Sequence, residues 1–365
     1  MSTKCIALLG RRDEPTDAIE EYCHYLDNAL RSQCFQLEIR RVPWEICGWP
    51  DALHALELQA ERWRGTWVLV QYTALAWSRR GFSWRVLRVL KILKSAGARV
   101  GIVFHDVEPY MGSRLVDSVR RTVQIRTMRR ILTMSNVAVF TVPLERVSWL
   151  AAIPSNATFI PVGPNLPIPF ATAADSAQHP PTIGVFSITG GQQGARETEM
   201  ILGAVRHASL FLGELRLSVF GRHAELREGH LRAGLKDLSV ELSVDGVIEP
   251  KLVVQKLSAC DVLLFVRGGI SSRRSSAIAG IACGLPVIAF PGSETAPPIT
   301  DAGVVLVPVE EPEQLNRVLV SVLSDAEYRA ALAARSRAAY RSHFTWPSIA
   351  ARFCAMLNKM NGPFN

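Results

Sequence analysis

Short apolar runs rich in β-branched residues alternate with longer stretches of helical periodicity along most of the chain. CIALLG, WVLVQY, TIGVFSI and DVLLFV are apolar at nearly every position, as expected of strands that are buried on both faces. The pattern therefore predicts parallel sheets with helices on both sides. We expect helices near residues 15–32, 50–63, 83–96, 113–134, 196–212 and 250–259, and three more near the end of the chain.

The alternating pattern occurs twice. GPNLPIPFATAADSAQHPPT, residues 163–182, separates the two occurrences and is rich in Pro and Ala, as linkers often are. A chain of 365 residues is also too long for one ordinary core. We predict an α/β protein with two doubly wound, Rossmann-like domains facing a central cleft. The domains are expected at residues 1–165 and 182–342, with a closing helix in 343–365 that packs back toward the first domain.

Composition limits the classes of protein that remain. The seven cysteines are scattered and form no CxxC pair, which favours a reducing compartment over a disulfide framework or a zinc site. MSTKCIALLG leads directly into a strand-like run, so we expect no signal peptide. No apolar stretch is long enough to span a membrane. These features predict a cytoplasmic protein.

The net charge of +8 is concentrated in one region. Residues 79–130 contain thirteen Lys/Arg and three Asp/Glu, a balance of +10 that leaves −2 for the rest of the chain. Within it, the segment from Trp84 to Lys94 has an apolar arc opposite a basic one. A solvated helix face would look the same, but such a field also suits an anionic membrane surface. Nucleic acid is the rival partner, although we find no recognised binding motif.

The most informative stretch is VLLFVRGGISSRRSSAIAGIACGLPVIAFPGSE, residues 262–294. It predicts a strand, a loop, a small-residue helix capped by Ser275 or Ser276, and a second strand. Arg273 and Arg274 precede the helix, where cations oppose the helix dipole unless an anion joins them. Two arginines here suggest a phosphate-bearing ligand, unless both simply point into water.

This stretch, with the residues that follow it to VLVPVEEPEQLNRVLVSVLSD, resembles the nucleotide-sugar-binding region of glycosyltransferase family 4 in the GT-B superfamily. IACGLPVIAF corresponds to a run that ends a helix in that family. The resemblance covers residues 182–358 well and the N-terminal half more weakly. It implies a GT-B fold, a nucleotide-diphosphate sugar as donor and retention of anomeric configuration.

The chain departs from the family at two positions. The family commonly carries E-x7-E at the start of this helix, where the present chain has Ser271 and Ala279. We expect Arg273, Arg274, Ser275 and Ser276 to replace the carboxylate contacts with contacts to the donor diphosphate. The alternative is a GT-B domain that no longer catalyses. Glu294 matches the family's glutamate after the glycine loop and is expected near the ribose or donor sugar, unless it is a solvated loop residue.

FSITGGQQGARE, residues 186–197, forms a second candidate loop. Gly190, Gly191 and Gly194 allow close approach of backbone to a phosphate, and Arg196 begins the expected helix as a substitute for the family's basic residues. The GGxxG spacing, with no acidic residue closing the next strand, does not fit a dinucleotide-binding fingerprint. A plain flexible turn is the alternative.

In the first half, Gly10 lies in a loop that follows a strand and matches a glycine-containing loop of GT-B enzymes. Arg11 and Arg12 are expected to face donor phosphates or the acceptor, and Asp17 to cap the next helix. His105 ends the fourth strand, where many members of the family carry a histidine close to the reacting centre. A histidine packed between domains is the other interpretation.

These observations predict a metal-independent hexosyltransferase-like enzyme with no cofactor beyond its donor substrate. It would move a sugar to a saccharide or lipid-linked acceptor in polysaccharide or glycolipid assembly, as a cytoplasmic protein at the inner membrane face. The first alternative is a non-catalytic GT-B-like protein that binds a nucleotide sugar or a partner glycosyltransferase. A nucleic-acid-binding protein is the second.

Overall fold

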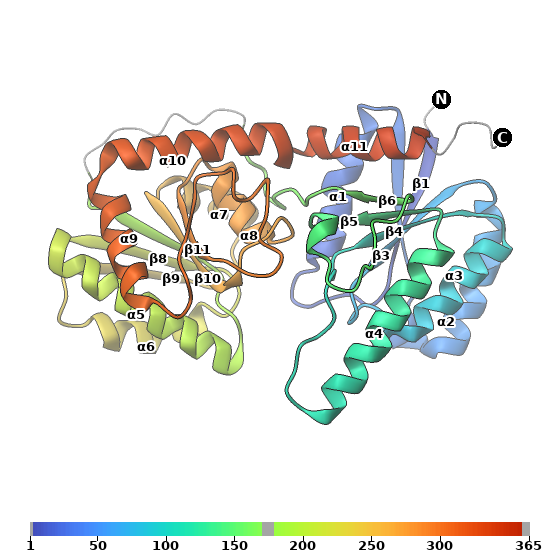
Figure 1. Ribbon diagram of the computed structural model, residues 1–365, viewed down its shortest axis with the longest axis horizontal. Helices are drawn as coiled ribbons and strands as arrows, with labels where there is room; N and C mark the ends of the chain where they lie inside the picture. Colours follow the sequence, from blue (N-terminus) through green and yellow to red (C-terminus); the bar gives the residue numbers. More distant parts are fainter. Residues whose placement is uncertain (1–2, 170–178, 360–365) are drawn as a thin grey trace. The chain divides into compact units, whose positions relative to one another are not determined.

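The structure, a computed structural model, describes residues 3–169 and 179–359, which form two compact units (Figure 1). The first contains the described residues up to Val162 together with the last helix, which begins at Trp346. The second runs from Gly163 to Thr345. The sequence boundary expected within 163–182 falls partly on residues 170–178, which lie outside the described residues.

The first unit is built on a parallel sheet with the strand order β2-β1-β3-β4-β5-β6 among its described residues. Its strands are β1 (Thr3–Leu9), β2 (Phe35–Arg41), β3 (Trp67–Tyr72), β4 (Arg99–Phe104), β5 (Val137–Phe140) and β6 (Ala157–Phe159). Its helices are α1 (Ala18–Arg31), α2 (Trp44–Ala60), η1 (Glu61–Trp63), η2 (Ser83–Arg85), α3 (Val86–Ser95), α4 (Leu115–Met134), η3 (Leu144–Arg146) and α11 (Trp346–Lys359).

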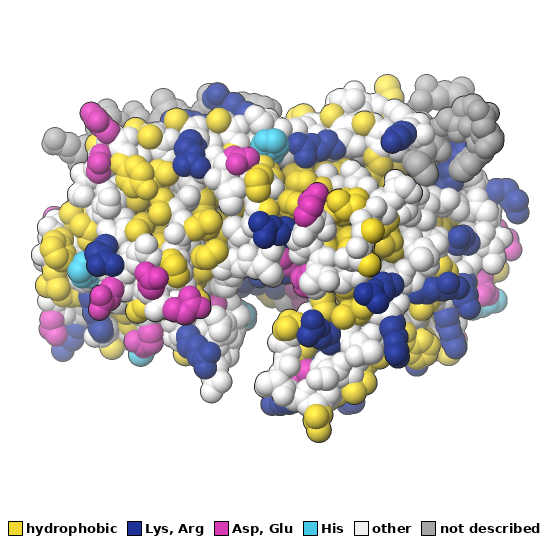
Figure 2. All heavy atoms as spheres, in the orientation of Figure 1, with side chains coloured by type: hydrophobic (Ala, Val, Ile, Leu, Met, Phe, Trp, Pro, Cys, Tyr) yellow, Lys and Arg dark blue, Asp and Glu magenta, His cyan; other side chains and the backbone are white. Residues whose placement is uncertain are grey.

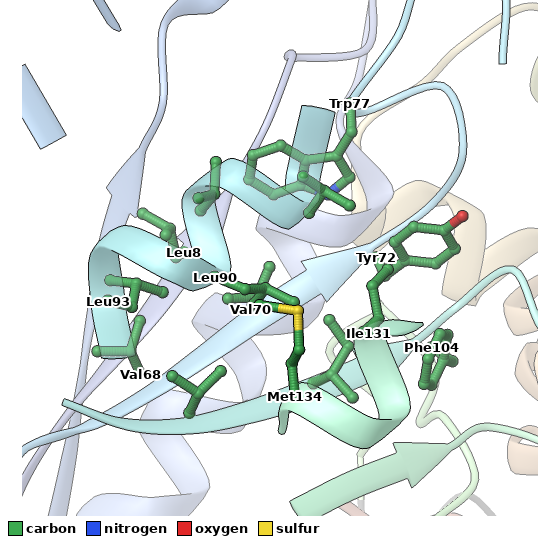
Figure 3. Close-up of a cluster of buried hydrophobic side chains, with 14 of the residues drawn as sticks. Leu8, Val68, Val70, Tyr72, Trp77, Leu90, Leu93, Phe104, Ile131 and Met134 are labelled. Carbon is green, nitrogen blue, oxygen red and sulfur yellow. The ribbon is translucent and has the colours of Figure 1, made fainter. Parts of the chain in front are cut away.

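Both faces of this sheet are buried. Alternate residues of the central strands pack against α2, α3 and α4, where Tyr72, Trp77 and Phe104 are fully buried (Figure 3). On the other face lie α1 and α11, where the ring of Trp346 stacks on Tyr25 at 5.5 Å and meets Tyr22 edge-on at 5.3 Å. The near-continuous apolar strands of the sequence follow from this double burial.

The second unit contains a parallel sheet with the strand order β12-β11-β10-β7-β8-β9 among its described residues. The apolar core on one face lies under α5, α6 and α9. The strands are β7 (Thr182–Phe186), β8 (Leu215–Phe220), β9 (Val240–Asp245), β10 (Val262–Gly269), β11 (Val287–Phe290) and β12 (Val304–Leu306). The helices are α5 (Gly191–Leu212), η4 (Glu225–Arg227), α6 (Glu228–Leu235), α7 (Pro250–Ser258), α8 (Ser275–Ala282), α9 (Pro312–Ser324), α10 (Ala326–Ala339) and η5 (Tyr340–Phe344).

The helix starts are set by local chemistry. Asp17 caps α1 as predicted, because its carboxylate accepts from the backbone N–H groups of Ile19 and Glu20. The prediction for α5 was wrong by five residues, since the helix begins at Gly191 and not near residue 196. Glycine lowers helix propensity, but the first turn tolerates it. The start of α5 therefore lies directly behind the end of β7.

In both sheets the strand order reverses next to the first strand, between β1 and β3 and between β7 and β10. Ligands of doubly wound sheets bind beyond the carboxyl ends of strands at such a switch point. In the first unit the loops there hold Gly10 and Ala76. In the second unit Gly190 lies in the loop after β7, and Arg267 lies near the carboxyl end of β10.

The hydroxyl of Tyr72 in β3 contacts Ser83 in η2, so a mutation of Tyr72 tests how this contact holds η2 against the strand. The hydroxyl lies 2.8 Å from Oγ of Ser83, and both side chains are fully buried. Replacing Tyr72→Phe leaves the Ser83 hydroxyl unsatisfied, so we expect a loss of about 1–3 kcal/mol in the free energy of unfolding by urea. Adding Ser83→Ala should recover part of that loss, and strictly additive losses would contradict the buried pair.

Candidate functional site

Three arginines gather around the N-terminus of α5 in the second unit. Arg222 follows β8, Arg227 ends η4, and Arg267 lies near the end of β10. The guanidinium of Arg227 donates to the carbonyl of Gly191 at 2.6 Å. Since β7, β8 and β10 are neighbours in the sheet, their carboxyl ends bring these cations to one edge.

The two loops at this edge hold strained backbone. Ser187 has φ = 68° and His223 has φ = 63°, in the left-handed region that non-glycine residues rarely adopt. Hydrogen bonds from the Ser187 and Ile188 amides to the carbonyls of Phe220 and Arg222, at 2.7 and 3.0 Å, hold the loops together. Strain of this kind persists where the surroundings enforce it, commonly at functional sites.

The N-terminus of α5 has no capping side chain among the described residues, and its first turn contains no acid. Gly190 occupies the N-cap, and Gly191 has φ = 66°. A Cβ atom at Gly194 would lie 1.8 Å from the carbonyl oxygen of Thr189, so only glycine fits there. The free amides of the first turn therefore form a site suited to an anion. Arg196, one turn further on, is exposed.

Arg267 is a half-buried cation without a compensating ion pair. Among the described residues it forms no salt bridge, and its Nε has no hydrogen-bond partner. Burial lowers the pKa of Arg267 from its ordinary value, while the nearby charge of Glu197 opposes the shift and that of Arg222 adds to it.

Glu197 lies behind this cation, and its side chain is fully buried. Its Oε2 accepts from the Thr189 amide at 2.7 Å, and its Oε1 has no partner within the described ranges. The carboxylate thus anchors the loop before α5 and offsets part of the charge of Arg267.

The loop that follows β10 is fastened to the loop that follows β11. Glu294 is buried, and its Oε2 accepts from Oγ of Ser271 at 2.9 Å and from Nε of Arg273 at 2.7 Å. The hydroxyl of Thr295 donates to the carbonyl of Ile270 at 2.5 Å and accepts from the Gly292 amide at 2.8 Å. The interpretation of Glu294 as a solvated loop residue is therefore wrong.

Burial by itself would raise the pKa of Glu294, but hydrogen bonds from Arg273 and Ser271 and the charge of Arg274 outweigh it. The pKa lies below its ordinary value as a result. The charge of Arg273 is therefore matched within the protein.

The predicted serine cap of α8 is wrong. Arg274 occupies the N-cap, and no side chain within the described ranges caps the helix. Ser275 and Ser276 form its first residues. The amides of Ala277 and Ile278 both bond to the carbonyl of Arg274, each at 3.0 Å.

In the first unit, Gly10 directly follows β1 and packs against the loop after β3. A Cβ atom there would lie 2.2 Å from the carbonyl oxygen of Ala76, which also accepts from the Arg11 amide at 2.8 Å. The Gly10 carbonyl accepts from Arg41 at 2.8 Å. The side chain of Arg11 lies 3.8 Å from the carboxylate of Glu45, so its charge already has a partner.

His105 is buried at the end of β4. Its Nε2 lies 2.8 Å from Oε1 of Gln71, and its ring meets Tyr22 edge-on at 4.9 Å. The amide nitrogen of Gln71 donates to the carbonyl of Leu69 at 3.0 Å, which leaves the amide oxygen to accept from the histidine. Gln71 therefore places a proton on Nε2 of His105.

Arg222, Arg267 and Gln71 are site residues that the sequence pattern did not predict. Each is a polar residue at or just beyond the end of an apolar strand, in VFGRH, LFVRGG and VLVQY. His105 occupies the same kind of position, so a polar residue at the end of each apolar strand is the signal that would have identified all three.

The ion pair of Glu294 predicts a pH-dependent stability. Because the folded pKa is lowered, the stabilisation is present above the unfolded pKa of about 4.3 and is lost as pH falls through the folded value. We expect Glu294→Gln to cost about 1.5–3 kcal/mol in urea unfolding at neutral pH. The cost should shrink in acid, whereas the exposed Glu310→Gln should change little. A cost independent of pH would refute the buried carboxylate.

No protein-family model matches this chain, and no curated protein matches it. Solved structures do match. HepE from Anabaena in complex with UDP and glucose has a TM-score of 0.67 at 13% identity, with 98% of this chain and 100% of that chain covered. A glycosyltransferase from Rickettsia africae has a TM-score of 0.68 at 12% identity, with both chains fully covered. MurG from Acinetobacter baumannii has a TM-score of 0.55 at 12% identity, covering 98% of this chain and all of that one.

The structural similarity extends over nearly the whole chain, but the sequence identities are so low that the similarity supports only the fold. With its two parallel, doubly wound sheets, the chain has the GT-B fold.

Proposed function

We propose that this protein is a glycosyltransferase that moves a sugar from a nucleotide-diphosphate sugar to an acceptor hydroxyl. The observation that carries the proposal is the cation Arg267, which has no ion pair in the described part of the chain. It lies at the edge where Arg222 and the uncapped amides of α5 converge. HepE, the fold neighbour described with UDP and glucose, supports a nucleotide sugar as ligand.

This arrangement suits a leaving group that gathers negative charge. As the bond from the sugar to the diphosphate breaks, charge develops on the diphosphate oxygens. Fixed cations and helix amides stabilise such charge without reorganising. Arg222, Arg267 and the amides after Gly190 can supply this stabilisation, so the proposed transfer is metal-independent. The resemblance to family 4 supports retention of configuration.

The ion pair with Glu294 changes the role that the sequence predicted for Arg273, which was a contact to the donor diphosphate. Glu294 already matches the charge of Arg273, so we assign the grip on the diphosphate to Arg222 and Arg267. Arg273 and Glu294 instead hold the loop that leads into α8, so that Arg274 and the first helical residues, Ser275 and Ser276, face the donor. In the first unit, His105 orients the sugar or the acceptor, and Gln71 positions His105.

The acceptor is proposed to be a saccharide or lipid-linked sugar in polysaccharide or glycolipid assembly, with the protein at the inner membrane face. No helix among the described residues is long and apolar enough to cross a membrane.

A non-catalytic protein that binds a nucleotide sugar is the second candidate. Ser271 and Ala279, which replace the family's two glutamates, are both fully buried. Ser271 is hydrogen-bonded to Glu294, so this position now serves the internal loop contact.

Calorimetry with UDP, GDP, ADP and CMP tests the donor site. We expect micromolar binding of one diphosphate, and a dissociation constant raised about 10–100-fold in Arg267→Ala, because a charge-assisted contact is lost. Arg216→Ala is the matched control, since Arg216 lies at the opposite end of β8 in an exposed pair with Glu241. Equal affinities in all three proteins, or no binding at all, would refute the assignment.

Turnover separates the enzyme from the non-catalytic candidate. With the donor identified by calorimetry, we expect the wild type to release free diphosphate in the presence of acceptor extracts. His105→Ala should lower that rate about 100-fold and leave the diphosphate affinity unchanged, because His105 would act on the sugar or acceptor. Tight binding with no donor consumption by the wild type would favour the non-catalytic candidate.

A further inference from the structure

The start of α4 exposes large apolar side chains. Leu115 is 90% exposed, Met111 71%, Val119 57%, Tyr110 53% and Val116 47%. They occupy the loop before α4 and its first two turns, which project from the rest of the first unit (Figure 1). These side chains leave apolar surface exposed to water, whereas folding usually buries such surface.

Arginines surround this apolar tip. Residues 110–130 contain six arginines and one aspartate, a balance of +5. Arg114 is the N-cap residue next to Leu115, and Arg121 follows two turns later on the same side of α4. Arg126, Arg129 and Arg130 are exposed further along the helix. Figure 2 shows hydrophobic and basic side chains next to each other over this end of α4.

The tip is held in place by the remaining arginine. Arg120 pairs with Asp117 at 2.8 Å and lies over the rings of Tyr110 and Phe82 at 4.9 and 5.6 Å. Gln124 accepts from the Tyr110 amide at 2.7 Å and donates to the Gly81 carbonyl at 2.9 Å. The exposed apolar side chains are therefore mounted on an ordered base.

The same contacts join the tip to a second exposed patch. Trp84, two residues beyond Phe82, is 44% exposed, and the guanidinium groups of Arg85 and Arg88 lie over its ring at 5.3 and 5.8 Å. The two segments follow β3 and β4, so they belong to one edge of the sheet. We call residues 84–88 together with 110–121 the basic apolar edge.

Three kinds of partner could cover this edge. A second copy of the chain would bring two positive surfaces together, and nucleic acid would leave Leu115, Met111 and Val119 without apolar contacts. An anionic bilayer satisfies both components, because acyl chains accept the aliphatic tip while lipid phosphates accept the arginines and tryptophan lies at the interface.

We propose that the basic apolar edge docks the protein on an anionic membrane surface, with the tip of α4 inserted at the level of the lipid headgroups. The docking itself is separate from the transfer reaction. One consequence for the acceptor rests on the proposed function. His105 and the loop before α4 both follow β4, so a lipid-linked acceptor in that surface would approach the first unit at the same end of the sheet as His105.

Vesicle sedimentation of the full chain tests the docking. The probes are vesicles of phosphatidylcholine alone and of phosphatidylcholine mixed with phosphatidylglycerol. We expect binding to the anionic vesicles at least about tenfold tighter than to the neutral ones, and weaker in high salt. Leu115→Ser with Val119→Ser should weaken binding about tenfold. Arg114→Gln with Arg121→Gln should remove most of the preference for anionic lipid.

Matched controls come from the second unit. Leu210→Ser with Phe211→Ser removes side chains that are 77% and 67% exposed, and Arg232→Gln removes an exposed cation. Both controls should bind vesicles like the wild type, and thermal unfolding should confirm that every variant is folded. Unchanged binding in the Leu115/Val119 variant would overturn the proposal, as would binding to oligonucleotides but not to vesicles, or a dimer that depends on Leu115. Diphosphate titration without vesicles remains an independent test of the donor site.

Discussion

The central strands of both sheets are buried on both faces, and this constraint decides where polar chemistry can occur. Alternate residues of β3 and β4 face either α2, α3 and α4 or α1 and α11, so almost every position along these strands is apolar. Along these two strands, polar side chains are then confined to the strand ends and the adjoining loops, where backbone groups and water can satisfy them. Gln71, His105 and Arg267 all lie at or just beyond such ends.

Carboxylates determine which of the many arginines are available for a ligand. Asp17 bonds Arg41 at 3.0 Å, Glu45 lies near Arg11, and Glu294 holds Arg273. Each of these acids turns a cation into part of the framework. Arg267 differs in this respect. The nearby acid Glu197 accepts a hydrogen bond from the loop before α5 through one carboxylate oxygen, and it forms no salt bridge with Arg267 among the described residues. The distribution of acids, more than the number of arginines, marks the candidate anion site.

The fold followed from the sequence because it depends on periodicity, which every residue of a strand or helix repeats. The Asp17 cap and the elements on either side of residues 163–182 follow from such local signals. The site followed less well, because it depends on single partners distant in sequence. Nothing around Arg273 reveals that Glu294 would neutralise it, and nothing around Gln71 reveals that it would meet His105. The start of α5 is harder to predict for a simpler reason, since its glycines are typical of a loop although the helix already includes them.

The loops after β10 and β11 touch at Gly269 and Gly292, where a Cβ atom on Gly269 would lie 2.6 Å from the other residue's Cα. Here main chain rests on main chain, so no side chain can change rotamer to absorb a displacement. The hydrogen bonds of Thr295 and Glu294 add further links between the same two loops. A ligand that shifts one loop must therefore shift the other as well, so the two loops move as one rigid unit at the end of the sheet.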